Sequence, residues 1–174
     1  MKVVLTGRPG IGKTTVVKKV VSHFKGDICG FYTEEIRDES GRRKGFVVVD
    51  VDGNRALLAS KEGNSPYRVG SYSVFVEEFE KIALPQLERA IREKIPAIID
   101  EIGKMELFSD RFELYVREIF SDDDISTLAT VPLKNIHPVV SWIKRLPQVL
   151  LIEVNYTNRD LLPEEIIKIL ERSV

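Results

Sequence analysis

Short apolar runs alternate with longer segments of helical periodicity along most of this chain. Residues 2–6 form a β-branched run that stops at a glycine, which is typical of a buried strand. Residues 13–24 then place apolar side chains at helical spacing, and Gly26 predicts the end of that helix. The alternation continues towards the C-terminus, so we expect a mainly parallel sheet with helices on both faces.

The segment after the first helix has a different pattern. We expect strands at residues 28–36, 46–51 and 55–59, with turns at residues 38–41 and 52–53. These three strands predict a β-meander attached to the α/β scaffold. Residues 61–71 are rich in Gly, Asn, Ser and Pro, and we expect them to form a surface loop.

The remaining two thirds of the chain return to alternation. We expect strands at residues 97–99, 127–131 and 149–154, and helices at residues 76–94, 111–120, 138–145 and 163–171. Pro85 lies inside the first of these helices and could kink or split it. The length of 174 residues predicts a single domain over residues 1–174.

Composition excludes several classes of protein. The formal net charge is only −1, although 30% of the residues are charged, so bulk charge gives no reason to expect nucleic-acid binding. No apolar run approaches the roughly 20 residues of a membrane span, and no signal peptide is recognisable. The single cysteine, Cys29, permits neither an internal disulfide nor a cysteine-based metal site. We therefore expect a cytoplasmic protein without membrane partners.

A glycine-rich loop lies between the first strand and the first helix. Its sequence, Gly7-Arg8-Pro9-Gly10-Ile11-Gly12-Lys13-Thr14, fits the phosphate-binding pattern G-x-x-x-x-G-K-[ST] without a gap. Glycines let the backbone turn tightly and bring its N–H groups to phosphate oxygens. The ammonium group of Lys13 suits the β- and γ-phosphates, and the Thr14 hydroxyl can ligate Mg²⁺. This P-loop predicts binding of a nucleoside triphosphate with Mg²⁺.

A second motif supplies acid. The apolar run at residues 97–99 ends in Asp100, which we expect on the metal side of the site. Glu101 can orient and deprotonate an attacking water, which favours hydrolysis over transfer to an acceptor. Lys104 could reach the γ-phosphate or a leaving oxygen; alternatively, it is solvated or paired with Glu106.

The acid motif also carries a family resemblance. Residues 100–107, DEIGKMEL, resemble the D-E-I-G-x-M-E-L signature of a small nucleoside-triphosphatase family first described in thermophiles, and the human cancer-related NTPase is similar. Agreement extends to GRPGIGKTT at residues 7–15, the strand at residues 30–35, ATVP at residues 129–132 and NRD at residues 158–160. The resemblance thus covers nearly the whole chain.

The resemblance implies a P-loop NTPase fold of the RecA-like additional-strand type with an inserted β-hairpin. It also implies slow, Mg²⁺-dependent hydrolysis of ATP, GTP, CTP and UTP to the diphosphate and phosphate, by what we expect to be a monomer. The residues it implies around the nucleotide are Gly7, Arg8, Pro9, Gly10, Ile11, Gly12, Lys13, Thr14, Thr15, Ile98, Ile99, Asp100, Glu101, Ile102, Gly103, Lys104 and Met105. Among them, Lys13, Glu101 and Lys104 are the expected catalytic residues, and Thr14 and Asp100 the expected metal ligands.

Alternatives remain open at this stage. A kinase for a nucleotide, a nucleoside or an RNA 5′ end would use the same loop, as would a nucleotide-dependent switch module. Thr130 could sense the γ-phosphate, and Asn158 and Arg159 could approach the base or ribose. The candidates for a transition-state arginine, each of which could equally be a surface charge, are Arg8, Arg37, Arg42, Arg43 and Arg111.

Overall fold

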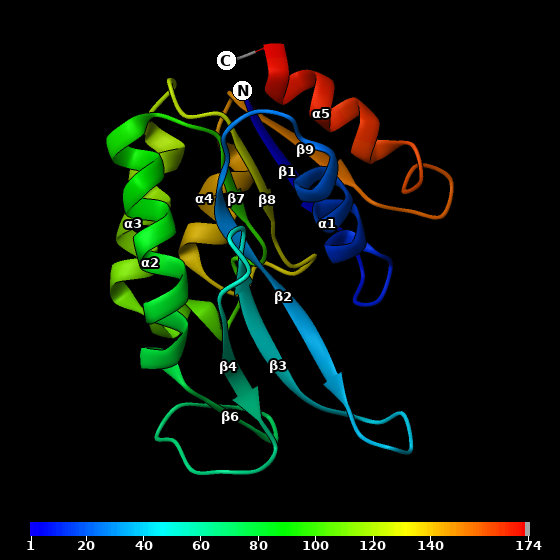
Figure 1. The fold of residues 1–174 in the computed structure, drawn as a ribbon, viewed down its shortest axis with the longest axis vertical. Coiled ribbons are helices and arrows are strands. Elements are labelled where there is room, and N and C mark those ends of the chain that lie inside the picture. The colour runs from blue at the N-terminus through cyan, green and yellow to red at the C-terminus, as the bar shows by residue number, and fades with distance from the viewer. Residues whose placement is uncertain (173–174) are drawn as a thin grey trace.

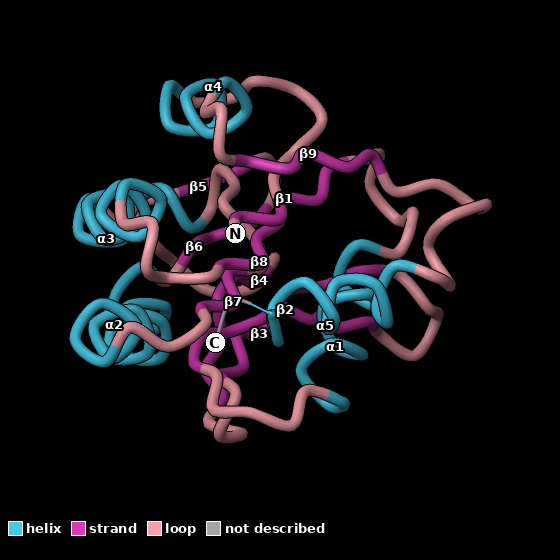
Figure 2. Tube along the Cα trace, turned by 90° about the horizontal axis from the view of Figure 1, so that it is seen from above, coloured by secondary structure: helices cyan, strands magenta, loops and turns pink. Residues whose placement is uncertain are grey.

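The computed structural model describes residues 1–172, which form one nine-stranded sheet with helices on both faces (Figures 1 and 2). The strands are β1 (Lys2–Thr6), β2 (Cys29–Arg37), β3 (Arg43–Asp50), β4 (Arg55–Ser60), β5 (Arg68–Val69), β6 (Tyr72–Val74), β7 (Ala97–Ile99), β8 (Thr127–Thr130) and β9 (Val149–Glu153). The helices are α1 (Lys13–His23), α2 (Val76–Glu93), α3 (Asp110–Ser121), α4 (Pro138–Arg145) and α5 (Leu162–Arg172), with a 3₁₀ turn η1 (Glu106–Phe108).

The order of the strands positions the functional motifs. It is β5-β6-β4-β3-β2-β7-β8-β1-β9, and the five strands from β2 to β9 in this order run parallel. Strand β8 separates β1, which leads into the P-loop, from β7, which leads into Asp100. The predicted additional-strand architecture is therefore confirmed. Because parallel strands end at the same edge, both motifs lie at one edge of the sheet.

The predicted meander is confirmed, and it is longer than expected. Strands β2, β3 and β4 pair antiparallel, and β6 and β5 extend the same sheet beyond β4. The β2–β3 hairpin projects away from the helices (Figure 1). Strands β5 and β6 lie within or beside the segment that we expected to be a loop. They are only two and three residues long, so their side chains carry no readable period.

The helices divide between the two faces of the sheet. Helices α1 and α5 cover one face, and α2, α3 and α4 cover the other (Figure 2). Helix α2 continues unbroken past Pro85. The N–H that proline lacks would have bonded to the carbonyl of Lys81, and both residues lie on the exposed side of the helix, where water can satisfy that carbonyl.

Two apolar clusters fill the space between the sheet and its helices. Val3, Leu5 and Ile98 pack beneath α1 and α5, whereas Val4 and Ile99 belong to the larger cluster beneath α2, α3 and α4. This alternation along β1 and β7 follows from the two-residue period of a strand. Within residues 1–172, no helix has both the length and the apolar character that a membrane crossing requires.

Candidate functional site

The P-loop is built on glycines that adopt positive φ. These angles are 150° at Gly7, 80° at Gly10 and 113° at Gly12, a region that favours glycine. At Gly7 a Cβ would also lie only 3.1 Å from the carbonyl oxygen of Val154. Helix α1 begins immediately after Gly12, which has no side chain to cap it. The first N–H groups of α1 are therefore available to an anion.

Lys13 links this loop to the acidic motif. Its Nζ donates a hydrogen bond of 2.9 Å to the carbonyl oxygen of Gly7 and lies 3.6 Å from Oε2 of Glu101. The lysine side chain is only 11% exposed, and that of Glu101 is 33% exposed. The ammonium group is thus held between the P-loop and Glu101. A phosphate bound in the loop would lie next to this ammonium group.

Asp100 is the buried centre of the site. Only 1% of the residue is exposed, and its carboxylate accepts hydrogen bonds from the hydroxyls of Thr14 (2.9 Å) and Thr130 (2.6 Å). The backbone N–H of Thr33 donates a longer bond of 3.4 Å. Burial raises the pKa of Asp100, and these hydrogen bonds oppose that rise. Thr130, from β8, therefore contacts the acid rather than standing apart from it.

The Thr14 and Asp100 oxygens fit a hard divalent cation such as Mg²⁺. Magnesium prefers oxygen ligands and is commonly held by one or two protein groups together with phosphates and waters. No basic side chain among residues 1–172 forms an ion pair with Asp100. Lys13 favours the charged form of Asp100 from a distance, but a buried carboxylate without an ion-pair partner is costly. A metal ion between the loop and this acid would supply the missing charge.

The side chain of a second glutamate, Glu106, lies close to that of Glu101. A Cβ placed on Gly103 would lie 2.6 Å from Oε1 of Glu101 and 3.0 Å from Oε1 of Glu106, so the two carboxyl groups flank the same glycine. Glu106 is 5% exposed, and burial raises its pKa well above the ordinary value, with the charge of Glu101 adding to the rise. Burial also raises the pKa of Glu101, while Lys13 opposes the shift.

The other residues that we expected around the nucleotide differ in how far their side chains are exposed. The side chains of Ile98, Ile99 and Ile102 are fully buried in the apolar clusters, and Met105 packs against one of them. Their side chains support the site from within the core. Lys104 is exposed, and in the described part of the chain it forms no ion pair with Glu106.

The candidate arginines are mostly engaged with other groups. Arg37 and Arg43 both pair with Glu35 on the β2–β3 hairpin, at 2.5 and 2.8 Å. Arg111 lies 3.4 Å from Glu88, between α3 and α2. Arg8 alone belongs to the P-loop, and its guanidinium lies 5.0 Å from the ring centroid of Tyr156. A group at that distance from an aromatic face makes a cation–π contact.

Lys144, which the sequence did not mark as a candidate, binds the loop that follows β8. The Nζ of Lys144 donates hydrogen bonds of 2.9 Å to the carbonyl oxygens of Pro132 and Leu133 and to Oδ1 of Asn135. Burial lowers the pKa of Lys144, and the positive charge of Lys13 lowers it further. Lys144 thus fixes the loop that follows β8. A lysine on an amphipathic helix gives no sequence signal of this role.

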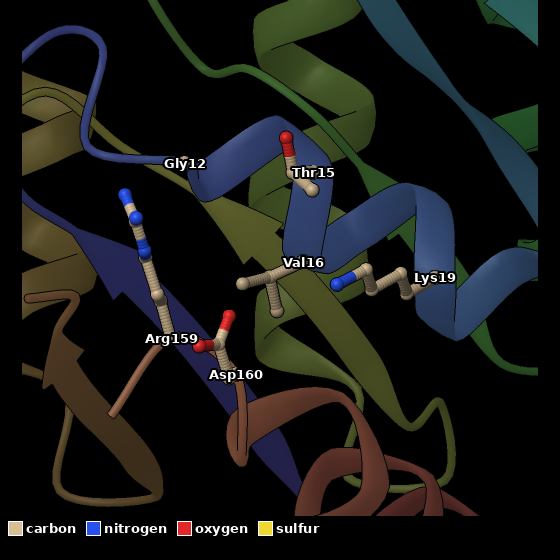
Figure 3. Close-up of a pocket in the computed structure, with 6 residues that line it drawn as sticks. All are labelled: Gly12, Thr15, Val16, Lys19, Arg159 and Asp160. Carbon is tan, nitrogen blue, oxygen red and sulfur yellow. The ribbon is translucent and has the colours of Figure 1, made fainter. Parts of the chain in front are cut away.

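A cavity of about 280 Å³ lies beside the P-loop (Figure 3). Its wall consists of Gly12, three residues of α1 and two from the loop before α5: Gly12, Thr15, Val16, Lys19, Arg159 and Asp160. Gly12, Thr15 and Arg159 were expected near the nucleotide, whereas Val16, Lys19 and Asp160 were not. Only the tertiary structure brings residues 12–19 together with residues 159–160.

Comparison with known proteins gives a consistent result. The sequence model of a family described as NTPase matches residues 2–167. The nucleoside-triphosphatase THEP1 of Aquifex aeolicus is 47% identical, over 99% of this chain and 100% of that protein. The cancer-related nucleoside-triphosphatase of Homo sapiens is 38% identical, over 98% of this chain and 97% of its own.

Two solved structures have the same fold. The crystal structure of THEP1 from Aquifex aeolicus superposes with a TM-score of 0.91 at 46% identity, covering 99% of this chain and 100% of that one. The solution structure of the human cancer-related nucleoside triphosphatase gives a TM-score of 0.83 at 37% identity, with 99% and 98% of the two chains covered.

Proposed function

Because this chain belongs to the NTPase family, we propose that it hydrolyses nucleoside triphosphates to the diphosphate and inorganic phosphate. One observation carries the proposal at the level of residues. Lys13 bridges the P-loop carbonyl of Gly7 and the carboxylate of Glu101, while Thr14 is hydrogen-bonded to Asp100. The phosphate cradle and the acidic pair thus face one another across the place where a terminal phosphate would lie.

The P-loop binds the triphosphate in this proposal. Its backbone N–H groups and the N-terminal end of α1 face the phosphate oxygens, and the partial positive charge of the helix favours the anion. Lys13 exchanges its contact with the Gly7 carbonyl for the β- and γ-phosphate oxygens. Glycines at positions 7, 10 and 12 allow the close approach of the backbone.

Thr14 and Asp100 are the proposed ligands of Mg²⁺. When bound, the ion neutralises charge on the β- and γ-phosphate oxygens. Thr130 and the Thr33 amide keep the Asp100 carboxylate in place through their hydrogen bonds. The protein therefore supplies a preorganised pair of oxygens that requires little rearrangement.

Glu101 is the proposed general base. It accepts a proton from water as the water oxygen bonds to the γ-phosphorus and the bond from phosphorus to the β–γ bridging oxygen breaks. Burial and the charge of Asp100 raise the pKa of Glu101, against the opposing effect of Lys13, which makes it a stronger base than an ordinary glutamate. Lys13 stabilises the negative charge that develops on the leaving diphosphate.

Slow turnover and broad base tolerance complete the proposal. Arg37, Arg43 and Arg111 pair with acids away from the P-loop, and the guanidinium of Arg8 lies against the Tyr156 ring, so these four offer no support for an arginine that acts within the chain. Without such a group, P-loop enzymes hydrolyse triphosphates slowly. The proposed phosphate and metal contacts involve only the triphosphate, which ATP, GTP, CTP and UTP share, and this supports use of all four.

A phosphate-release assay tests this function. We expect all four triphosphates to yield free phosphate with Mg²⁺, and excess chelator to stop the reaction. Lys13→Ala should retain less than about 1% of the rate, because the loop loses its charge on the phosphates. Lys25→Ala, a change at an exposed lysine after α1, serves as the matched control and should retain full activity. Transfer of the γ-phosphate to an added acceptor in place of water would contradict hydrolysis.

A further inference from the structure

The carboxyl groups of Glu101 and Glu106 converge over Gly103, in the segment that follows β7. A Cβ built on this glycine would lie 2.6 Å from Oε1 of Glu101 and 3.0 Å from Oε1 of Glu106. Both distances are shorter than ordinary contacts between non-bonded atoms, so any side chain at position 103 would displace the two carboxyl groups. The missing side chain therefore lets a second acid lie beside the proposed general base.

The two oxygens of the Glu101 carboxylate have different neighbours. Oε2 lies 3.6 Å from the ammonium group of Lys13, whereas Oε1 is the oxygen next to Gly103 and Glu106. A carboxylate that is held at one oxygen can still turn about its bond to Cγ, because this torsion has a broad energy well. The direction in which Glu101 points therefore depends on what its Oε1 contacts.

Burial and charge decide which of the two acids keeps a proton. Glu101 has Lys13 beside it, whereas Glu106 is almost fully buried and forms no ion pair within residues 1–172. Two neighbouring carboxylates repel each other in a buried site, so one of them stays neutral. Burial and the charges of Glu101 and Asp100 accordingly raise the pKa of Glu106 well above its ordinary value. The proton stays on Glu106, and Glu101 keeps its charge.

Glu106 is held in place by contacts with two helices. Its carbonyl oxygen accepts a hydrogen bond of 3.1 Å from the N–H of Ser109, at the end of η1. The Ser109 hydroxyl donates a bond of 2.6 Å to Oε2 of Glu80 on α2, and it accepts one of 3.1 Å from the N–H of Phe112 in the first turn of α3. These contacts fix η1 against α2 and α3, so Glu106 offers Glu101 a rigid partner.

A neutral Glu106 carboxyl has one proton to donate. The backbone N–H groups of Gly103 and of Glu106 itself interact with this carboxyl and satisfy acceptor positions on it. The O–H group then has the charged Oε1 of Glu101 beside it as an acceptor. Hydrogen bonds from a hydroxyl to a carboxylate are short and about twice as strong as those between neutral groups.

We propose that Glu106, in its neutral form, donates a hydrogen bond to Oε1 of Glu101 and so positions the general base. The Glu101 carboxylate is then held at both oxygens, by Glu106 at Oε1 and by Lys13 at Oε2. The inference rests on the proposed function, in which Glu101 accepts the proton from water. Because Glu106 acts through Glu101, its loss lowers kcat and leaves KM nearly unchanged.

Two uncharged replacements of Glu106 test the hydrogen bond. Glu106→Gln and Glu106→Met both remove the carboxyl and are close to it in length, but only glutamine can donate to Glu101. We expect Glu106→Met to lower kcat about tenfold or more, with KM within about twofold, and Glu106→Gln to recover most of the lost rate. Steady-state phosphate release from ATP with Mg²⁺ measures both constants. Glu171→Met, at an exposed position in α5, is the control and should keep the wild-type rate.

A double variant separates positioning from a general structural effect. In the Glu101→Gln background there is no base to position, so adding Glu106→Met should lower the residual rate by less than about twofold. Equal rates of the Glu106→Met and Glu106→Gln variants would overturn the proposal. A full further loss in the double variant would overturn it too, because the effect of Glu106 would then not pass through Glu101.

Carboxyl ¹³C spectra test the proton on Glu106 without any turnover. In the nucleotide-free protein at pH 6, we expect one glutamic acid with the chemical shift of a neutral carboxyl. This signal should be missing from Glu106→Gln and should move in Glu101→Gln, where the acceptor loses its charge. A charged Glu106 would overturn the proposal. If the wild type releases no phosphate, the proposed hydrolysis fails, and the spectra alone decide whether Glu106 donates to Glu101.

Discussion

The Thr14 hydroxyl donates a hydrogen bond of 2.9 Å to Oδ2 of Asp100, across 86 positions of sequence. This bond joins the first turn of α1 to the end of β7, with β8 lying between the two motif-bearing strands. The carboxylate it reaches is buried and lacks a basic partner among residues 1–172. We expect that this buried, unpaired carboxylate lowers the stability of the fold and is retained for its role in the site.

The first prediction separates activity from stability at Asp100. Asp100→Asn removes a buried charge but keeps groups that can hydrogen-bond, so the variant should unfold at the same or a higher temperature than the wild type. Its Mg²⁺-dependent phosphate release should fall by about a hundredfold or more, because a metal ligand loses its charge. Thermal unfolding without nucleotide and a phosphate-release assay check the two halves. A large drop in unfolding temperature would mean that the carboxylate stabilises the fold.

The second prediction concerns the general base. Glu101→Gln keeps the size of the side chain but cannot accept the proton from water, so turnover should fall by about a hundredfold to a thousandfold. Nucleotide affinity should stay within about threefold, since the P-loop groups proposed to bind the phosphates are all retained. Calorimetric binding and single-turnover phosphate release measure the two quantities. Weakened binding with an unchanged rate would make Glu101 a binding residue.

The P-loop strand, its helix and the acid strand were predictable because their signals are local. Gly7, Gly12 and Lys13 have fixed spacing within eight residues, and the apolar run before Asp100 is bounded on both sides. The meander was also predictable, because a glycine marks each of its two turns in the sequence. The structure places both glycines, Gly41 and Gly53, at positive φ. The structure therefore confirms those elements to within about three residues at each end.

The remaining parts of the site depend on tertiary contacts that leave no trace in a local pattern. Lys144 reads as a solvated helix residue, yet it binds two carbonyls of the loop after β8. Glu106 lies between the apolar residues Met105 and Leu107, and η1 turns its side chain inwards, so that it is only 5% exposed. Asp160 reaches the cavity wall only because β9 lies next to β1. Lys144 and Asp160 act on elements distant in sequence, and the burial of Glu106 depends on the packing of η1 against α2 and α3, so no local pattern marks these roles.

The third prediction follows from the contacts of Lys144. Lys144→Met should loosen the loop at residues 131–137, which begins directly after Thr130, the hydroxyl partner of Asp100. We expect turnover to fall about tenfold or more, since small displacements near a catalytic group slow the reaction steeply, while KM changes little. Lys144→Arg, which keeps a cation, should recover most of the rate. Steady-state kinetics of both variants check this, and a Met variant with wild-type kcat would show that the loop position does not matter.

The fourth prediction uses the buried carboxyl of Glu106. Burial and the charges of Glu101 and Asp100 raise its pKa well above 4.5, while the backbone N–H groups of Gly103 and Glu106 act in the opposite direction. Between 4.5 and the raised pKa, the folded chain holds a proton that the unfolded chain releases. Stability due to this group is therefore present at low pH and is lost as the pH rises through that window.

Replacing Glu106 by Gln removes this pH dependence and leaves a neutral side chain of the same shape. The unfolding temperature of Glu106→Gln should exceed that of the wild type by more at pH 8 than at pH 5, because the wild type bears the cost of a buried charge only at the higher pH. Unfolding followed by circular dichroism at both pH values measures the two differences. Glu171→Gln, at an exposed position in α5, controls for the general effect of removing one negative charge. Equal differences at pH 5 and pH 8 would show that Glu106 ionises in the folded protein as it does in the unfolded chain.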